Sequence, residues 1–103
     1  MDMKRYRLKP GVLCWSKNGE ESVICVHRAR GDMDFFGVDS VGTFIVESMI
    51  NGKSDVDIIK SLKCVFKIGR QKAKEDLESF VSKLFRRKIV EEVIEGQPNE
   101  KKE

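Results

Sequence analysis

The first part of the chain contains short β-prone runs separated by turn signals. The run over residues 12–15 ends at Asn18-Gly19, a dipeptide typical of hairpin turns, and an apolar run returns over residues 22–27. A further turn at Arg30-Gly31-Asp32 leads to a third run over residues 33–38. Because the connections are short, we predict an antiparallel meander of three strands, with residues 33–38 at an edge.

After Asp39 the apolar period changes from two to about 3.6 residues, which predicts three amphipathic helices. Asp39 or Ser40 can cap the first helix, and Asn51-Gly52 ends it. Ser54 can cap the second helix, and Gly69 separates the second from the third. The third helix has the strongest apolar face, which must pack on the core. Its members are Ala73, Leu77, Phe80, Val81, Leu84 and Phe85.

These patterns predict an α+β fold: an N-terminal three-stranded antiparallel sheet followed by a three-helix bundle. The length of 103 residues suits one domain, which we place at residues 1–94, with a short final strand near residues 89–94. The polar residues 95–103 are expected to form a disordered tail.

The chain contains no apolar run near the ~20 residues that a membrane-spanning helix needs, so no membrane contact is expected. Basic residues near the N-terminus are not followed by an apolar segment. We therefore expect no secretory signal and a cytoplasmic location.

Charge is distributed unevenly along the chain. Residues 32–52 carry four acidic and no basic side chains, whereas residues 70–90 carry seven basic and three acidic ones. The net charge of +3 is too small by itself to favour a nucleic-acid partner.

The chain shows no pattern of catalytic or metal-binding residues. Cys14, Cys25 and Cys64 are odd in number and widely spaced, which argues against disulfides and metal sites, so we interpret them as small apolar residues. The single histidine, His27, has no partner pattern, and no phosphate-binding glycine loop is present. We expect no cofactor, no metal and no enzymatic activity in this chain.

The order of elements and several short motifs over residues 9–93 resemble the PqqD-like family, also called RiPP recognition elements. Asp39 stands where that family usually has Asn, and the third strand is unusually aromatic. The residues that carry the resemblance are Lys9-Pro10-Gly11, Phe36-Gly37-Val38-Asp39, Ile45, Met49, Gly52-Lys53-Ser54, Ile58-Ile59, Asp76-Leu77, Phe80-Val81 and Leu84.

The resemblance implies a winged-helix-like domain that binds the leader segment of a ribosomally made precursor peptide. It further implies that the leader adds as a strand to the third strand and packs against the third helix. The domain would present the leader to a modifying enzyme, often a radical SAM protein. An exposed edge strand can also pair with a second copy, so a homodimer is a further candidate.

The predicted peptide site has one part on the edge strand and one on the third helix. Phe36 and Val38 share a strand face and are expected to point inward, whereas Phe35 is equally compatible with the core and with the peptide. The edge-strand candidates are Met33, Asp34, Phe35, Phe36 and Gly37.

On the third helix, two flanks border the core stripe at ~100° per residue. One flank, with Lys72, Asp76, Lys83 and Arg87, is wholly charged. The other flank mixes charged and apolar residues, which suits a leader of alternating apolar and acidic residues, so we choose it for the site. Its members are Lys74, Glu78, Val81 and Phe85. Phe85 equally suits a role in covering the core against the C-terminal segment.

A winged helix-turn-helix DNA-binding regulator is the alternative function. The third helix opens with the basic run Arg70-Gln71-Lys72-Ala73-Lys74, as a recognition helix would. Against this, the segment that would form the wing contains Glu91, Glu92 and Glu95, which would face phosphates unfavourably.

Overall fold

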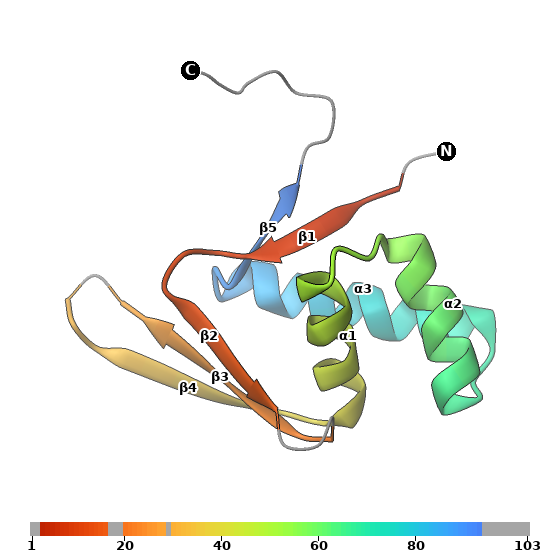
Figure 1. Cartoon of the computed structure of the whole chain (residues 1–103), viewed down its shortest axis with the longest axis horizontal. Coiled ribbons are helices and arrows are strands. Elements are labelled where there is room, and N and C mark those ends of the chain that lie inside the picture. Colours follow the sequence, from red (N-terminus) through yellow and green to blue (C-terminus); the bar gives the residue numbers. More distant parts are fainter. Residues whose placement is uncertain (1–2, 17–19, 29, 94–103) are drawn as a thin grey trace.

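The structure is a computed structural model of the chain, and it describes residues 3–16, 20–28 and 30–93. Within these residues the chain forms five strands and three helices (Figure 1). The strands are β1 (Arg5–Leu8), β2 (Val12–Ser16), β3 (Ser22–His27), β4 (Met33–Val38) and β5 (Val90–Val93). The helices are α1 (Ser40–Ile50), α2 (Asp55–Phe66) and α3 (Arg70–Arg86). The predicted α+β class is confirmed, whereas the Asn18-Gly19 turn and the tail at 95–103 lie outside the described residues.

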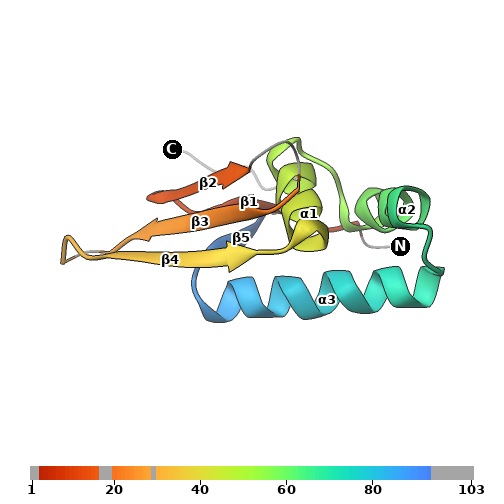
Figure 2. The same ribbon diagram turned by 90° about the horizontal axis from the view of Figure 1, so that it is seen from below.

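Strands β2, β3 and β4 form an antiparallel sheet in that order, so β4 is an edge strand as predicted. One face of this sheet packs on the core, on the side where α1 and α3 lie (Figure 2). Its buried side chains are Val12, Ile24, Val26 and Val38. The opposite face exposes large apolar side chains that are 40–61% accessible to solvent. These are Leu13, Trp15, Val23, Met33 and Phe35.

The two predicted helix caps are present and fix where α1 and α2 begin. The Asp39 carboxylate accepts a hydrogen bond from the Gly42 N–H at 2.8 Å, and the Ser54 hydroxyl accepts one from the Asp57 N–H at 3.3 Å. Each bond satisfies a backbone donor that the helix itself leaves without a partner. Since Asp39 directly follows β4, its cap turns the chain from the edge strand into α1.

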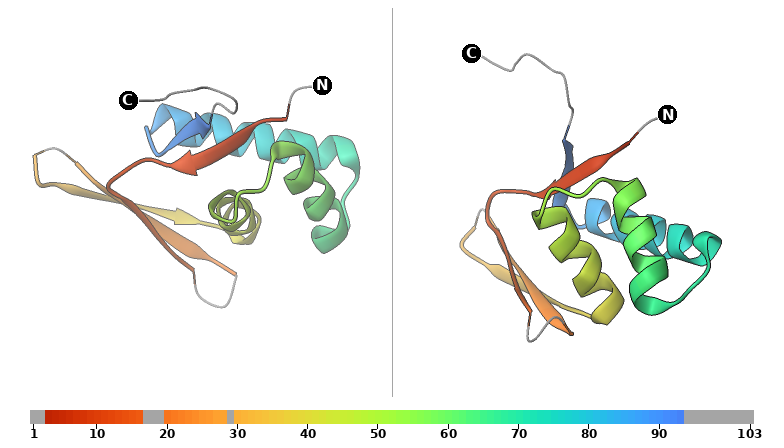
Figure 3. Two further views of the ribbon diagram at one scale, coloured as in Figure 1. Left: turned by 45° about the horizontal axis from the view of Figure 1, so that its top comes forward. Right: turned by 45° about the vertical axis from the view of Figure 1, so that its right-hand side comes forward.

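A second, two-stranded sheet pairs β1 with β5 (Figure 3). The prediction included a strand near β5 but not β1. Only four residues long, β1 has little local signal, and its strand state depends on long-range pairing such as Leu8 opposite Val90. The residue before β1 also bonds to the start of α2, where the Asp55 N–H donates to the Lys4 carbonyl at 2.7 Å.

The core joins the inner sheet face to all three helices. Its fully buried members include Ile24, Ile45, Ile58 and Leu62, and the α3 residues Ala73, Leu77 and Leu84 are at most 3% exposed. Phe80 is partly buried against this cluster. The apolar face that was predicted for α3 is therefore largely structural.

Replacing Gly42 by alanine is expected to destabilise the protein. A Cβ at this buried position would lie 2.5 Å from Val38 Cγ1 and 2.9 Å from Phe80 Cε1. Overpacking of this kind lowers the free energy of unfolding by about 1–3 kcal/mol, whereas the higher helix propensity of alanine raises it by at most ~1 kcal/mol. Urea denaturation should show a lower midpoint for Gly42→Ala. Gly37→Ala is the control because its Cβ would meet no heavy atom within 4 Å, and equal stability of both variants would contradict the prediction.

Candidate functional site

The free edge of β4 presents backbone groups that no strand of the described residues pairs with. The hairpin of β3 and β4 begins where the Arg28 N–H donates to the Asp32 carbonyl at 2.8 Å. From this pair onward, backbone hydrogen bonds join every second pair of opposite residues in the two strands. The N–H and C=O groups of Met33, Phe35 and Gly37 therefore point away from β3. An edge of this kind is a template for one more strand.

A groove of about 280 Å³ lies between the inner side of β4 and α3. We call it the β4–α3 groove. Its lining is mostly apolar, and two exposed basic side chains border it, one on α3 and one at the C-cap of α3. The side chains that define it are Phe36, Val38, Phe80, Lys83, Leu84 and Arg87. The groove adjoins a hollow of about 500 Å³ between α1 and α3, to which Phe80 and Lys83 also contribute.

Arg28 and Arg87 hold the edge strand against the end of α3. The Arg87 guanidinium lies over the Phe36 ring, 4.4 Å from its centroid. Arg28 donates to the Asp34 carboxylate at 2.7 Å and, at 3.5 Å, to the Arg87 carbonyl. These contacts set the spacing between β4 and α3, and they give Asp34 a partner within the protein.

A second cleft, of about 320 Å³, lies on the other side of α3, against β1 and α2. The rings of Tyr6 and Phe85 meet there edge to face, with centroids 5.8 Å apart. Burial raises the pKa of Tyr6, and the negative charges of Asp55, Glu92 and Glu78 add to this effect.

The structure divides the predicted site residues between these two places. Residues 33–37 form the free edge of β4, with Phe36 partly buried and Phe35 61% exposed. The four residues chosen on α3 are not beside β4: Lys74, Glu78, Val81 and Phe85 line the second cleft instead. Val81, at 8% exposed, belongs to the core. The part that these four residues play in peptide binding stays a prediction.

The residues of α3 and its C-cap that do border β4 come from the flank that was not chosen from the sequence. Lys83 and Arg87 are one helical turn apart and stand beside Phe80 and Leu84. Further along this flank, Lys72 and Asp76 form an ion pair at 2.9 Å. The hydrogen bond that Lys72 donates to the Asp76 carboxylate, followed by the negative charge of Asp76, raises the pKa of Lys72. The sequence feature that could have identified this flank is a pair of basic residues, four positions apart, at the end of the helix.

Catalytic and metal chemistry find little support among the described residues. No group of three or more His, Cys, Asp or Glu side chains in this part of the chain could hold a metal ion. Burial raises the pKa of the Cys14 thiol, so the thiol stays neutral and weakly nucleophilic near neutral pH. Of the three cysteines, which we interpret from the sequence as small apolar residues, Cys25 is buried, Cys14 is partly buried, and Cys64 is exposed. None of the described helices is long and apolar enough to cross a membrane.

The fold and the groove define a winged-helix-like α+β domain with an open sheet edge. Two solved structures are similar to it. One is TbiB1 in complex with the TbiA(beta) leader peptide, with a TM-score of 0.71 and 22% identity over 90% of this chain and 99% of that one. The other is lasso peptide synthetase B1 complexed with the leader peptide, with a TM-score of 0.72 and 20% identity over 84% and 98%.

The family model of coenzyme PQQ synthesis protein D (PqqD) matches residues 23–90. The chain belongs to the PqqD family, which confirms the family predicted from its motifs. No curated protein sequence matches the chain. These comparisons give no support to the DNA-binding alternative. In the structure, the would-be wing residue Glu91 is paired with Arg7 at 2.6 Å.

Proposed function

We propose that this chain binds the leader segment of a ribosomally synthesised precursor peptide and presents it to a modifying enzyme. The observation that carries the proposal is the free edge of β4 beside the β4–α3 groove. Addition of a strand to such an edge gives affinity through backbone hydrogen bonds, and a pocket beside it gives specificity. Membership of the PqqD family and the two similar leader-peptide complexes support the proposal.

A peptide strand paired with β4 would send alternate side chains to the two faces of the sheet. Those on the inner face enter the β4–α3 groove, where Phe36, Phe80 and Leu84 favour apolar groups. Lys83 and Arg87 favour acidic groups at the same face. The best ligand is therefore an extended peptide whose inner-face positions are apolar or acidic.

The proposed role is that of an adaptor, and we assign no catalytic step to this chain. The chemistry belongs to the enzyme that receives the bound leader, for which a radical SAM protein is one class. A cytoplasmic location fits this adaptor role.

Titration of isotope-labelled protein with a candidate leader peptide tests the proposal. The leader would be taken from a short open reading frame beside the gene. We expect amide shifts to concentrate at residues 33–37, at Phe80 and Lys83 of α3, and at its C-cap Arg87. Shifts centred on Lys74 and Glu78 would favour the second cleft, and the absence of saturable shifts with the leader would contradict the proposal.

A second copy of the chain is the competing occupant of the β4 edge. Pairing of two β4 strands would bury the same backbone groups that the leader needs. Sedimentation over a range of protein concentrations separates the two cases. A dimer that dissociates as leader is added would place both partners on the same edge.

A further inference from the structure

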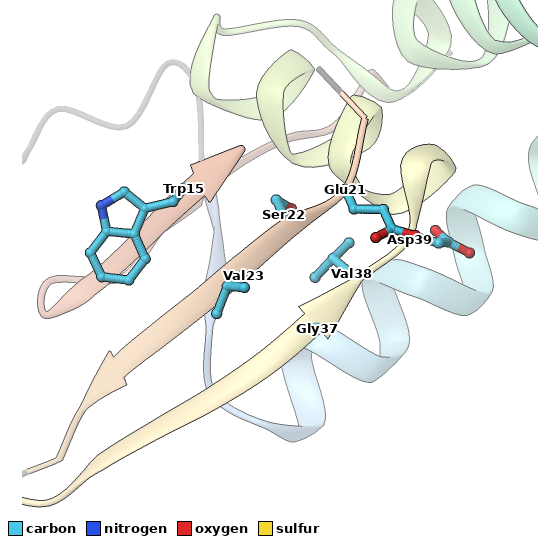
Figure 4. Close-up of a pocket in the computed structure, with 7 residues that line it drawn as sticks. All are labelled: Trp15, Glu21, Ser22, Val23, Gly37, Val38 and Asp39. Atoms are coloured by element: carbon cyan, nitrogen blue, oxygen red, sulfur yellow. The ribbon is translucent and has the colours of Figure 1, made fainter. Parts of the chain in front are cut away.

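A hollow of about 590 Å³ lies on the outer face of the sheet, on the opposite face of β4 from the β4–α3 groove (Figure 4). We call it the Gly37 hollow. Trp15 of β2, Val23 of β3 and Gly37 of β4 are cross-strand neighbours in one row along it. Because Gly37 has no side chain, and a Cβ there would meet no heavy atom within 4 Å, the row is open at the edge of β4.

The Gly37 hollow is apolar along the row and acidic at one end. Trp15 and Val23 are 54% and 40% exposed. Glu21 and Asp39 also line the hollow, and neither carboxylate forms an ion pair with another described residue. Asp39 is engaged as the cap of α1, whereas the Glu21 carboxylate has no ion-pair partner among the described residues. This combination fits a side chain with a long apolar stem and a cationic head.

We propose that the Gly37 hollow is a second subsite for the bound peptide and takes an arginine or lysine side chain. The inference rests on the proposed function, because it needs a peptide strand on β4. Residues directly opposite each other on paired strands point to the same face. The peptide residue opposite Gly37 therefore points to the outer face, where its stem crosses Gly37 toward Val23 and its head meets Glu21. Trp15 lines the other end of the hollow, beyond Val23.

The two subsites together set the register of the peptide. The β4–α3 groove selects apolar or acidic side chains at alternate positions, whereas the Gly37 hollow selects a basic one between them. A slip of one residue would move every side chain to the opposite face. It would bring the basic residue against Lys83 and Arg87 and the acidic residues against Glu21. Like charges would then oppose the slipped register at both sites.

The inference is tested with a leader that binds, and with Trp15 as the reporter. Trp15 is the only tryptophan in the chain, so its emission reports directly on the hollow. Leader binding measured by calorimetry should be accompanied by a shift or quenching of this emission. Changing one leader residue, an arginine or lysine, to glutamate should weaken binding about tenfold and remove the emission change. In Glu21→Lys protein, the same altered leader should recover most of its affinity.

Two further variants guard against indirect effects. Gly37→Val puts a side chain where the row is open at β4, keeps the backbone N–H and adds a residue that favours strands, so its fold should persist. It should bind the unaltered leader about tenfold more weakly and show no Trp15 response. Glu20→Lys makes the same charge change as Glu21→Lys at an exposed residue outside the hollow and should not rescue the altered leader.

The outcomes separate this inference from the proposed function. If calorimetry detects tight leader binding but no basic residue matters and Trp15 does not respond, the subsite is wrong and the peptide-binding function stands. If calorimetry detects no leader binding, both the subsite and the proposed peptide-binding function are wrong. If Glu20→Lys restores the affinity of the altered leader as strongly as Glu21→Lys does, the effect comes from net charge alone, and the proposed subsite is wrong.

Discussion

Phe35→Pro is expected to weaken leader binding about 100-fold while the protein stays folded. The Phe35 N–H points to the free edge of β4, so proline removes no ladder bond to β3 at this position. It does remove a donor that an added strand needs, and its ring stands where that strand would lie. One lost hydrogen bond and one unpaired acceptor together amount to roughly 3 kcal/mol, or about 100-fold in affinity. Calorimetry with the leader gives the affinity, and circular dichroism with thermal unfolding checks the fold.

Phe35→Ala is the matched control for the proline variant. It keeps the backbone N–H and removes only a side chain that is 61% exposed, so its loss of affinity should stay below about tenfold. N-methylation of leader residues, one at a time, removes the N–H groups that the leader would donate to the carbonyls of β4, without touching the protein. Full affinity of Phe35→Pro, or indifference to every N-methyl group, would exclude strand addition at β4.

The double variant Lys83→Glu/Arg87→Glu is expected to weaken leader binding by about 10- to 100-fold at low salt. Both side chains border the β4–α3 groove, and Arg87 also covers the Phe36 ring. Reversing the two charges turns attraction for acidic leader residues into repulsion. Near 1 M salt, where the Debye length is roughly 3 Å, most of the difference from the unaltered protein should disappear. Fluorescence anisotropy of a labelled leader over a salt series measures both effects.

The variant Lys4→Glu/Lys74→Glu makes the same change of net charge in the second cleft. If the leader binds along β4 and its groove, this variant should lose less than about threefold, in line with the small worth of exposed charges away from a contact. If Lys4→Glu/Lys74→Glu instead loses more affinity for the leader than Lys83→Glu/Arg87→Glu, the leader binds at the flank of α3 that was chosen from the sequence. Equal losses would indicate attraction by net charge alone.

The sequence predicted the buried stripe of α3 but not which of its two flanks faces β4. The spacing correctly identified Ala73, Leu77 and Leu84 as buried. It could not say which flank turns toward β4, because both flanks border the same apolar stripe. The answer depends on β1, which pairs with β5 and brings Tyr6 against Phe85. Because the Phe85 side of α3 faces β1 and α2, Lys83 and Arg87 lie on the opposite side, beside the edge strand β4.

The sequence by itself determined the local features of this protein: the β4 edge strand, the inward side of Phe36, and the caps at Asp39 and Ser54. These follow from residue periods and from side chains that bond to nearby backbone, and both act over a few residues. Only the tertiary structure decided the rotation of α3 about its own axis, the pairing of β1 with β5, and the hollow over Gly37. Each of these depends on contacts between segments far apart in the chain, and a period of 2 or 3.6 residues carries no information about a partner at that distance.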